Sequence, residues 1–165
     1  MQKFKYIRLV ATALVIVILD QLTKYWVSIK IEPGTYIFPE PIPVIKNFFY
    51  LVHIHNTGAA WGSFSGGSLW LGILALLVIS SLFFFRKYLE LERSLMQYVM
   101  GLLLGGIIGN LIDRFYRGYV IDFIDIHLPG YRWPAFNIAD SAICIAVVLY
   151  IVLIILDSFK KANKA

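Results

Sequence analysis

Long apolar segments alternate with short polar ones along the chain. Four of them, at about residues 6–27, 68–85, 95–112 and 138–156, are each close to the roughly 20 residues that a helix needs to cross a bilayer core. The first is followed by DQLTKYWV, where a signal peptide would carry small residues for cleavage, so we expect a retained helix. The pattern predicts an α-helical polytopic membrane protein with four transmembrane helices, in a single integral membrane domain over residues 1–165.

Basic residues flank these segments in three short clusters. With four spans, all three clusters lie on the same side of the membrane, and the positive-inside rule assigns that side to the cytoplasm. We therefore expect both termini to be cytoplasmic and the two longer connections to face outward. The clusters are Lys3, Lys5 and Arg8; Arg86, Lys87 and Arg93; and Lys160, Lys161 and Lys164.

The first outer connection, about residues 28–67, has the composition of strands and turns. Prolines in PGTYIFPEPIPVI exclude a regular helix, and the aromatic and β-branched residues of FFYLVHIHN are typical of a strand. Glycines in TGAAWGSFSGG allow tight turns. We expect a small extracytoplasmic β element here, and a short loop over residues 113–137.

Composition supports a membrane protein and adds little else. The chain is 59% hydrophobic and 15% charged, with a mean hydropathy of +0.75, which is far from the balance of a soluble domain. Its net charge of +5 comes from the flanking clusters and does not indicate nucleic-acid binding. The single cysteine, Cys144, excludes an intramolecular disulfide and is expected to be a small buried side chain.

Polar side chains gather at the outer ends of the predicted helices and in the outer connections. Ionisable residues at membrane depth are functional candidates by default. Two of them, Asp122 and Asp125, lie in an apolar stretch with no basic residue between Arg117 and Arg132. The whole set is Asp20, Lys24, Asn110, Asp113, Arg114, Asp122, Asp125, Asn137, Asp140 and Ser141.

Several of these residues also have structural interpretations. Asn137 and Asp140 open the fourth helix, where an N-cap and a first-turn carboxylate are both favoured. Asp20 and Lys24 lie one turn apart, and we favour a structural pair with Lys24 snorkelling to the interface over direct chemistry. These alternatives remain open at the level of the sequence.

Carboxylates are the most numerous potentially reactive groups at this edge of the membrane. Two aspartates in a low-dielectric site do not both ionise easily, so one stays protonated while the other acts as a base. A serine or cysteine nucleophile has little support, because no G-x-S-x-G motif is present. His53, His55 and His127 form a minor zinc candidate without an HExxH motif, and we expect no metal or cofactor.

Five blocks in order resemble the lipoprotein signal peptidases (signal peptidase II), polytopic aspartic proteases of the bacterial inner membrane. They are DQLTK (20–24), NTGAAWG (56–62), GNLIDR (109–114), VIDF (120–123) and FNIADS (136–141). The resemblance implies that Asp122 and Asp140 are catalytic. It also implies that Asn110, Arg114 and Asn137 line the substrate pocket. The residues implied to bind substrate or support the site are Asp20, Lys24, Asn56, Gly58, Asn110, Asp113, Arg114 and Asn137.

The resemblance further implies an activity and a location. The family removes the signal peptide from prolipoproteins, cleaving before a diacylglyceryl-modified cysteine at the extracytoplasmic face, and globomycin blocks it. Such a protein would contact membrane lipids and work as a monomer. The family fold adds a β-sheet cradle and a mobile helical loop, expected here at residues 36–67 and after Asp122. The alternatives are a small transporter or proton pathway, or a non-catalytic lipoprotein-binding membrane protein.

Overall fold

The computed structural model describes residues 5–35, 40–59 and 63–163. Each of the four predicted segments is helical, although whether a helix crosses a membrane is a separate question. Parts of the predicted basic clusters and the end of the NTGAAWG block, residues 60–62, lie outside the described residues. The helices are α1 (Ile7–Lys30), α2 (Ser68–Phe84), α3 (Ser94–Tyr116) and α4 (Ile138–Ala162), with a short 3-10 helix η2 (Arg86–Tyr88).

Helix α3 is the centre of the bundle and packs against α1, α2 and α4. Glycines allow its close approach to the neighbouring helices. A Cβ atom on Gly105 would lie 2.8 Å from the Ala13 carbonyl oxygen of α1, and one on Gly109 would lie 2.6 Å from the Asp20 carboxylate. Because real Cβ contacts are not this short, these positions need glycine for α1 and α3 to pack as they do.

Two of the helices, α3 and α4, are long and apolar enough to cross a membrane by length and composition, and α2 is a shorter apolar helix of 17 residues. The helices also carry large apolar side chains on exposed faces, such as Leu22 on α1, Leu77 on α2 and Val148 on α4. In water such a continuous apolar surface is unfavourable, whereas lipid tails solvate it.

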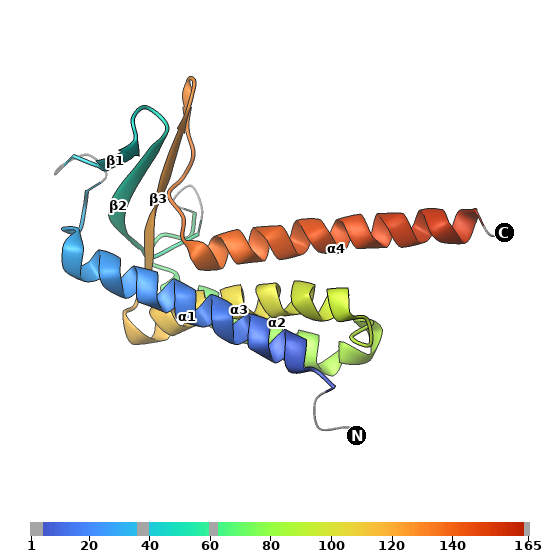
Figure 1. Cartoon of the computed structure of the whole chain (residues 1–165). Helices are drawn as coiled ribbons and strands as arrows, with labels where there is room; N and C mark the ends of the chain where they lie inside the picture. The colour runs from blue at the N-terminus through green and yellow to red at the C-terminus, as the bar shows by residue number, and fades with distance from the viewer. Residues whose placement is uncertain (1–4, 36–39, 60–62, 164–165) are drawn as a thin grey trace.

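A four-stranded antiparallel sheet stands at one end of the bundle, beside the last turn of α1 and the first turn of α4 (Figure 1). Its order is β1-β2-β3-β4, and Ile54 of β2 lies opposite Asp122 of β3. The strands are β1 (Ile42–Ile45), β2 (Phe49–Asn56), β3 (Val120–Leu128) and β4 (Tyr131–Arg132).

The prediction of a short loop over residues 113–137 is wrong, because part of this segment is helix and part is sheet. Its first part continues α3, and Asp122 and Asp125 lie on β3 rather than in a short loop. The segment after Asp122, where a mobile helical loop was expected, is the rest of β3 and a hairpin to β4. The β-branched and apolar residues of this segment form a strand because they pair with β2, which is far away in sequence. The local sequence alone does not reveal that pairing.

A small apolar cluster fixes the sheet to the helices. Ile121 and Phe123 of β3 pack with Val27 of α1 and with Ile31 just beyond its end, and all four side chains are at most 6% exposed. Burial of aliphatic and aromatic side chains stabilises this junction by roughly 1.5–3 kcal/mol each. Since Asp122 lies between Ile121 and Phe123, the cluster also determines where its carboxylate points.

Candidate active site

Asp122 and Asp140 line one cavity of about 570 Å³, where the sheet meets α3 and α4. Most of the lining is apolar. Cys144 also lines this cavity and is exposed, so the expectation of a buried cysteine is wrong. The other polar side chains of the lining come from Asn56, Arg114 and Ser141, and its larger apolar side chains include Trp133, Phe136 and Ile143.

The Asp122 carboxylate is held between two amide groups. Asn56 Nδ2 donates to Oδ2 and Asn137 Nδ2 donates to Oδ1, both at 2.8 Å. The Gly58 N–H donates to Asn56 Oδ1 at 2.9 Å, so the Asn56 amide must present its nitrogen to Asp122. Burial and, secondly, the charge of Asp140 raise the pKa of Asp122 to about 7, although both amide bonds oppose this shift.

Asp140 and Asn137 form a reciprocal cap at the start of α4. Asn137 Oδ1 accepts from the Asp140 N–H at 2.9 Å, and Asp140 Oδ2 accepts from the Asn137 N–H at 3.2 Å. The other Asp140 oxygen accepts from Asn110 Nδ2 at 2.7 Å. The predicted N-cap is therefore confirmed, and the same two side chains also reach the cavity network, so the structural and functional interpretations do not exclude each other.

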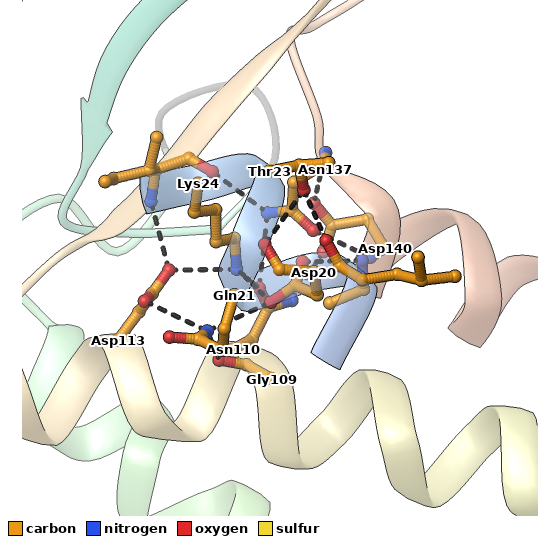
Figure 2. A network of polar contacts seen from close by, with 12 residues as sticks. Asp20, Gln21, Thr23, Lys24, Gly109, Asn110, Asp113, Asn137 and Asp140 are labelled. Atoms are coloured by element: carbon orange, nitrogen blue, oxygen red, sulfur yellow. Dashed lines mark hydrogen bonds and ion pairs between the residues drawn. The ribbon is translucent and has the colours of Figure 1, made fainter. Parts of the chain in front are cut away.

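Figure 2 shows a buried network of ion pairs and hydrogen bonds around Lys24, which includes Asn110 and Asp140. Lys24 Nζ lies 2.8 Å from the Asp20 carboxylate and 2.9 Å from that of Asp113, and all three side chains are fully buried. Lys24 also donates to Asn110 Oδ1 at 3.0 Å. The predicted pair with Asp20 is confirmed, but Lys24 does not snorkel: its ammonium finds two carboxylates inside the protein.

Lys24 determines the orientation of Asn110. An ammonium group can only donate, so the Asn110 oxygen must face it, and the Asn110 nitrogen is left to donate to Asp140. Lys24 is thus connected to Asp140 by hydrogen bonds through one intervening amide, that of Asn110. The residues Lys24, Asn110 and Asp140 come from three helices, so their contact depends on the close packing described above.

Sequence reasoning missed Gln21 as a part of this network. Its amide nitrogen lies within hydrogen-bond distance of Asp20, the Gly109 carbonyl and Asp113, at 3.1, 3.1 and 3.3 Å. The Ala139 N–H, at the start of α4, donates to Asp20 at 3.0 Å. The one available signal was that Gln21 lies inside the DQLTK block between two members of the network.

Arg114 projects from α3 into the cavity lining. Its Nη2 donates to the Gly58 carbonyl at 3.4 Å, whereas its buried Nε has no hydrogen-bond partner among the described residues. A buried N–H without a partner costs about 1–3 kcal/mol, so a ligand that accepts this bond gains by it. Arg114 is thus a donor available to a group in the cavity.

Asp125 does not belong to the cavity. It is fully buried on the other face of β3, where Arg132 of β4 contacts both of its oxygens and His127 Nε2 lies 2.9 Å from Oδ2. Arg132 therefore neutralises Asp125 from the neighbouring strand. The structure separates the two aspartates of the VIDFID sequence into two different environments.

The three histidines do not converge. His53 and His55 contact each other on β2, and His127 is paired with Asp125. Among the described residues, no group of three or more histidine, cysteine, aspartate or glutamate side chains is arranged to hold a metal ion. The three-histidine zinc hypothesis is therefore wrong.

Known proteins with a similar sequence or structure identify the family. Residues 12–156 match the family model described as Signal peptidase (SPase) II. The lipoprotein signal peptidase of Bacillus subtilis (strain 168) is 41% identical over 154 residues, which are 92% of this chain and 96% of that protein.

Two solved structures, both of bacterial membrane enzymes obtained by the in meso method, have the same fold. One is 35% identical with a TM-score of 0.81, and the match covers 93% of this chain and 90% of the other. The second is 34% identical with a TM-score of 0.74, covering 88% and 91%. The likeness therefore includes nearly the whole length of each chain.

The match to the family model and to the named relative places this chain in the class of aspartic peptidases, which are hydrolases. The family match then makes the assignment specific. This chain belongs to the signal peptidase II family. Membership favours a peptidase over a transporter, a proton pathway or a non-catalytic lipoprotein-binding protein.

Proposed function

We propose that this enzyme removes the signal peptide from diacylglyceryl-modified prolipoproteins by cleaving before the lipidated cysteine, with Asp122 and Asp140 activating the water. One observation carries the assignment of the dyad. Both carboxylates line one cavity, and the hydrogen bonds described above reach them from uncharged amide groups. Amides hold the geometry of a carboxylate pair without favouring its double ionisation as strongly as a bound cation would.

The chemistry follows from one proton shared by two carboxylates. The ionised aspartate takes a proton from water, which attacks the scissile carbonyl, and the protonated aspartate donates to the carbonyl oxygen. The tetrahedral intermediate then collapses: the C–N bond breaks, the aspartate that took the proton from water gives it to the leaving amine, and the other aspartate takes a proton back from a hydroxyl of the intermediate. A pKa of about 7 for Asp122 allows proton transfer in both directions near neutral pH. Because the pair is coupled, the shared proton belongs to both residues.

The supporting residues have separate proposed roles. Asn110 and Asn137 align the two carboxylates, and Arg114 donates from the cavity wall to a polar group of the bound substrate. Gly58 orients Asn56 and accepts from Arg114. The network of Asp20, Lys24 and Asp113 stabilises the junction of three helices on which the dyad depends.

We also propose that all four helices cross the bacterial inner membrane, with both termini cytoplasmic and the cavity at the extracytoplasmic face. The exposed apolar faces of the helices and the basic clusters support this topology. The apolar lining of the cavity, including Trp133 and Phe136, suits an acyl-bearing substrate that arrives from the bilayer. Lipids and a globomycin-type inhibitor are further expected ligands. Since one chain supplies every group named, a monomer suffices.

A gel-shift cleavage assay with a diacylglyceryl-modified prolipoprotein tests the proposal. Asp122→Asn and Asp140→Asn should each lower turnover by about 100-fold or more, because each removes one member of the acid–base pair. Asp125→Asn is the matched control on the same strand and should keep substantial activity. Full cleavage by Asp122→Asn would refute the dyad, and continued cleavage in the presence of a chelator is expected.

A further inference from the structure

His53 and His55 form a compact pair on β2, outside the residues that line the cavity. Two residues apart on a strand, they project on the same face, and their Nε2 atoms lie 3.2 Å apart. The ring centroids are 4.9 Å apart, with an edge-to-face angle of 70°. Two ring nitrogens therefore face each other at short range in a part of the protein that the peptidase chemistry does not use.

The His53 side chain is fixed by the segment that follows α1. Its Nδ1 lies 2.7 Å from the Ile31 carbonyl oxygen, and because that oxygen only accepts, Nδ1 carries the proton. The backbone of His53 is also bonded, to the Thr35 hydroxyl at 2.6 Å and to the Gly34 N–H at 2.8 Å. In the neutral form of His53, Nε2 therefore carries no proton, and its lone pair faces His55.

His55 is the adjustable member of the pair. It is exposed, and its ring stacks on Tyr119 with centroids 3.8 Å apart. A small rotation of the His55 ring against Tyr119, with the His55 proton moved from Nε2 to Nδ1 through solvent, makes the Nε2 lone pair of His55 available as well.

We propose that His53 and His55 bind a divalent transition metal ion, such as Cu²⁺ or Zn²⁺, through their two Nε2 atoms. Two nitrogens bound at 2.0–2.1 Å to a tetrahedral ion are about 3.3 Å apart, close to the 3.2 Å found here. The bond from Nδ1 of His53 to a backbone carbonyl is the outer contact that metal-binding histidines commonly make.

Two protein ligands define what kind of site this is. Water completes the coordination, which gives micromolar affinity rather than the tight binding of a structural zinc site. Cu²⁺ should bind more tightly than Zn²⁺, in keeping with the order of stability for nitrogen ligands. Both ligands lie on β2, so a bound ion would hold this part of the strand in its folded arrangement and so stabilise the folded enzyme.

The test uses the full-length enzyme in detergent with any affinity tag removed. Zn²⁺ binding is measured by competition with a chromophoric chelator, and Cu²⁺ coordination is measured by electron paramagnetic resonance. His55→Gln is the main variant, because His55 is exposed and its replacement is compatible with folding. His127→Gln is the matched control, since His127 lies on the sheet but is paired with Asp125. Cleavage in metal-free buffer shows that both variants are folded.

The wild type and His127→Gln should bind one Zn²⁺ per chain, with Cu²⁺ spectra showing coupling to two imidazole nitrogens. His55→Gln should bind at least about tenfold more weakly and lose the rise in melting temperature that Zn²⁺ gives the wild type. Equal affinity in His55→Gln and the wild type would place the metal elsewhere. The absence of saturable binding at micromolar metal would also refute the site.

Discussion

Asp122 and Asp125 lie three residues apart on β3, and the two faces of that strand surround them differently. Asp122 lines the cavity and receives hydrogen bonds from Asn56 and Asn137, which are neutral. Asp125 lies on the opposite face of the strand and is paired with Arg132 and His127. A cation beside a buried carboxylate compensates its charge, whereas amide groups hold the carboxylate in position without compensating the charge in this way. Both side chains are buried, so their partners rather than the depth of burial distinguish Asp125 from the proposed catalytic Asp122.

Among the residues outside the proposed dyad, Lys24→Met should have the largest effect on cleavage. This change leaves Asp20 buried without its cation and releases the Asn110 amide. Asp113 loses its shorter ion pair and keeps the longer one, with Arg117 at 3.5 Å. Unfolding should therefore become easier by about 3–5 kcal/mol. Cleavage should be almost abolished. Thermal unfolding in detergent and the prolipoprotein assay measure the two effects. Lys30→Met, at the exposed end of α1, is the control. Near-normal stability of Lys24→Met would show that the buried network is dispensable.

A smaller loss is expected for Asn56→Ala, which removes one of the two amide donors of Asp122. A hydrogen bond to a charged group contributes about 1.5–3 kcal/mol, so turnover should fall roughly ten- to a hundredfold while the fold is retained. Asn163→Ala, at the exposed end of α4, controls for a general effect of asparagine loss. Unchanged turnover in Asn56→Ala would mean that the amide does not align the reactive carboxylate.

The rate of cleavage should change several-fold with pH. With the pKa of Asp122 at about 7, the pair loses its shared proton as the pH rises through this value, and cleavage should decline between about pH 6 and pH 8. The Asn56 hydrogen bond lowers this pKa, so Asn56→Ala should move the decline to higher pH. Initial rates at constant ionic strength measure both curves, and coincident curves would contradict the prediction.

The same proton affects folding stability. Since the pKa of Asp122 is raised from 3.8, the folded protein keeps a proton that the unfolded chain releases, and this contribution is present below pH 4. It is lost as the pH rises to about 7. Wild-type stability should therefore decrease across this window by more than that of Asp122→Asn, whose side chain does not titrate.

The smallest effect on cleavage is expected on the other face of the strand. Arg132→Gln removes the cation of Asp125, which destabilises the hairpin by about 1–3 kcal/mol because the carboxylate stays buried. Turnover per folded molecule should stay within about twofold. Comparison with Asn56→Ala at a temperature where both variants are folded sharpens the contrast. A tenfold loss in Arg132→Gln would show that the two faces are coupled.

The sequence was sufficient for the helices and for most members of the site, and the reason is physical. Segments of about 20 apolar residues leave few alternatives, and aspartate or lysine in such segments needs a partner. Asp20 and Lys24 stood out on that basis, and Asn137 stood out as a possible N-cap of the fourth helix.

What the sequence did not reveal depends on contacts between distant segments. The pairing of β3 with β2 joins residues more than 60 positions apart, as in Asn56 with Val120, and no local pattern specifies such a register. The same holds for Arg132, which reaches Asp125 only because β4 folds back on β3. Gln21 was missed because its role depends on the approach of α3.

The cap at the start of α4 has a consequence for damaged molecules. The bonds between Asn137 and Asp140 that begin the helix also position both proposed catalytic carboxylates. Fraying of that first turn would separate them before the rest of the bundle opens. We therefore expect a partly unfolded enzyme to be inactive. Damaged molecules would then not cleave other membrane proteins at random.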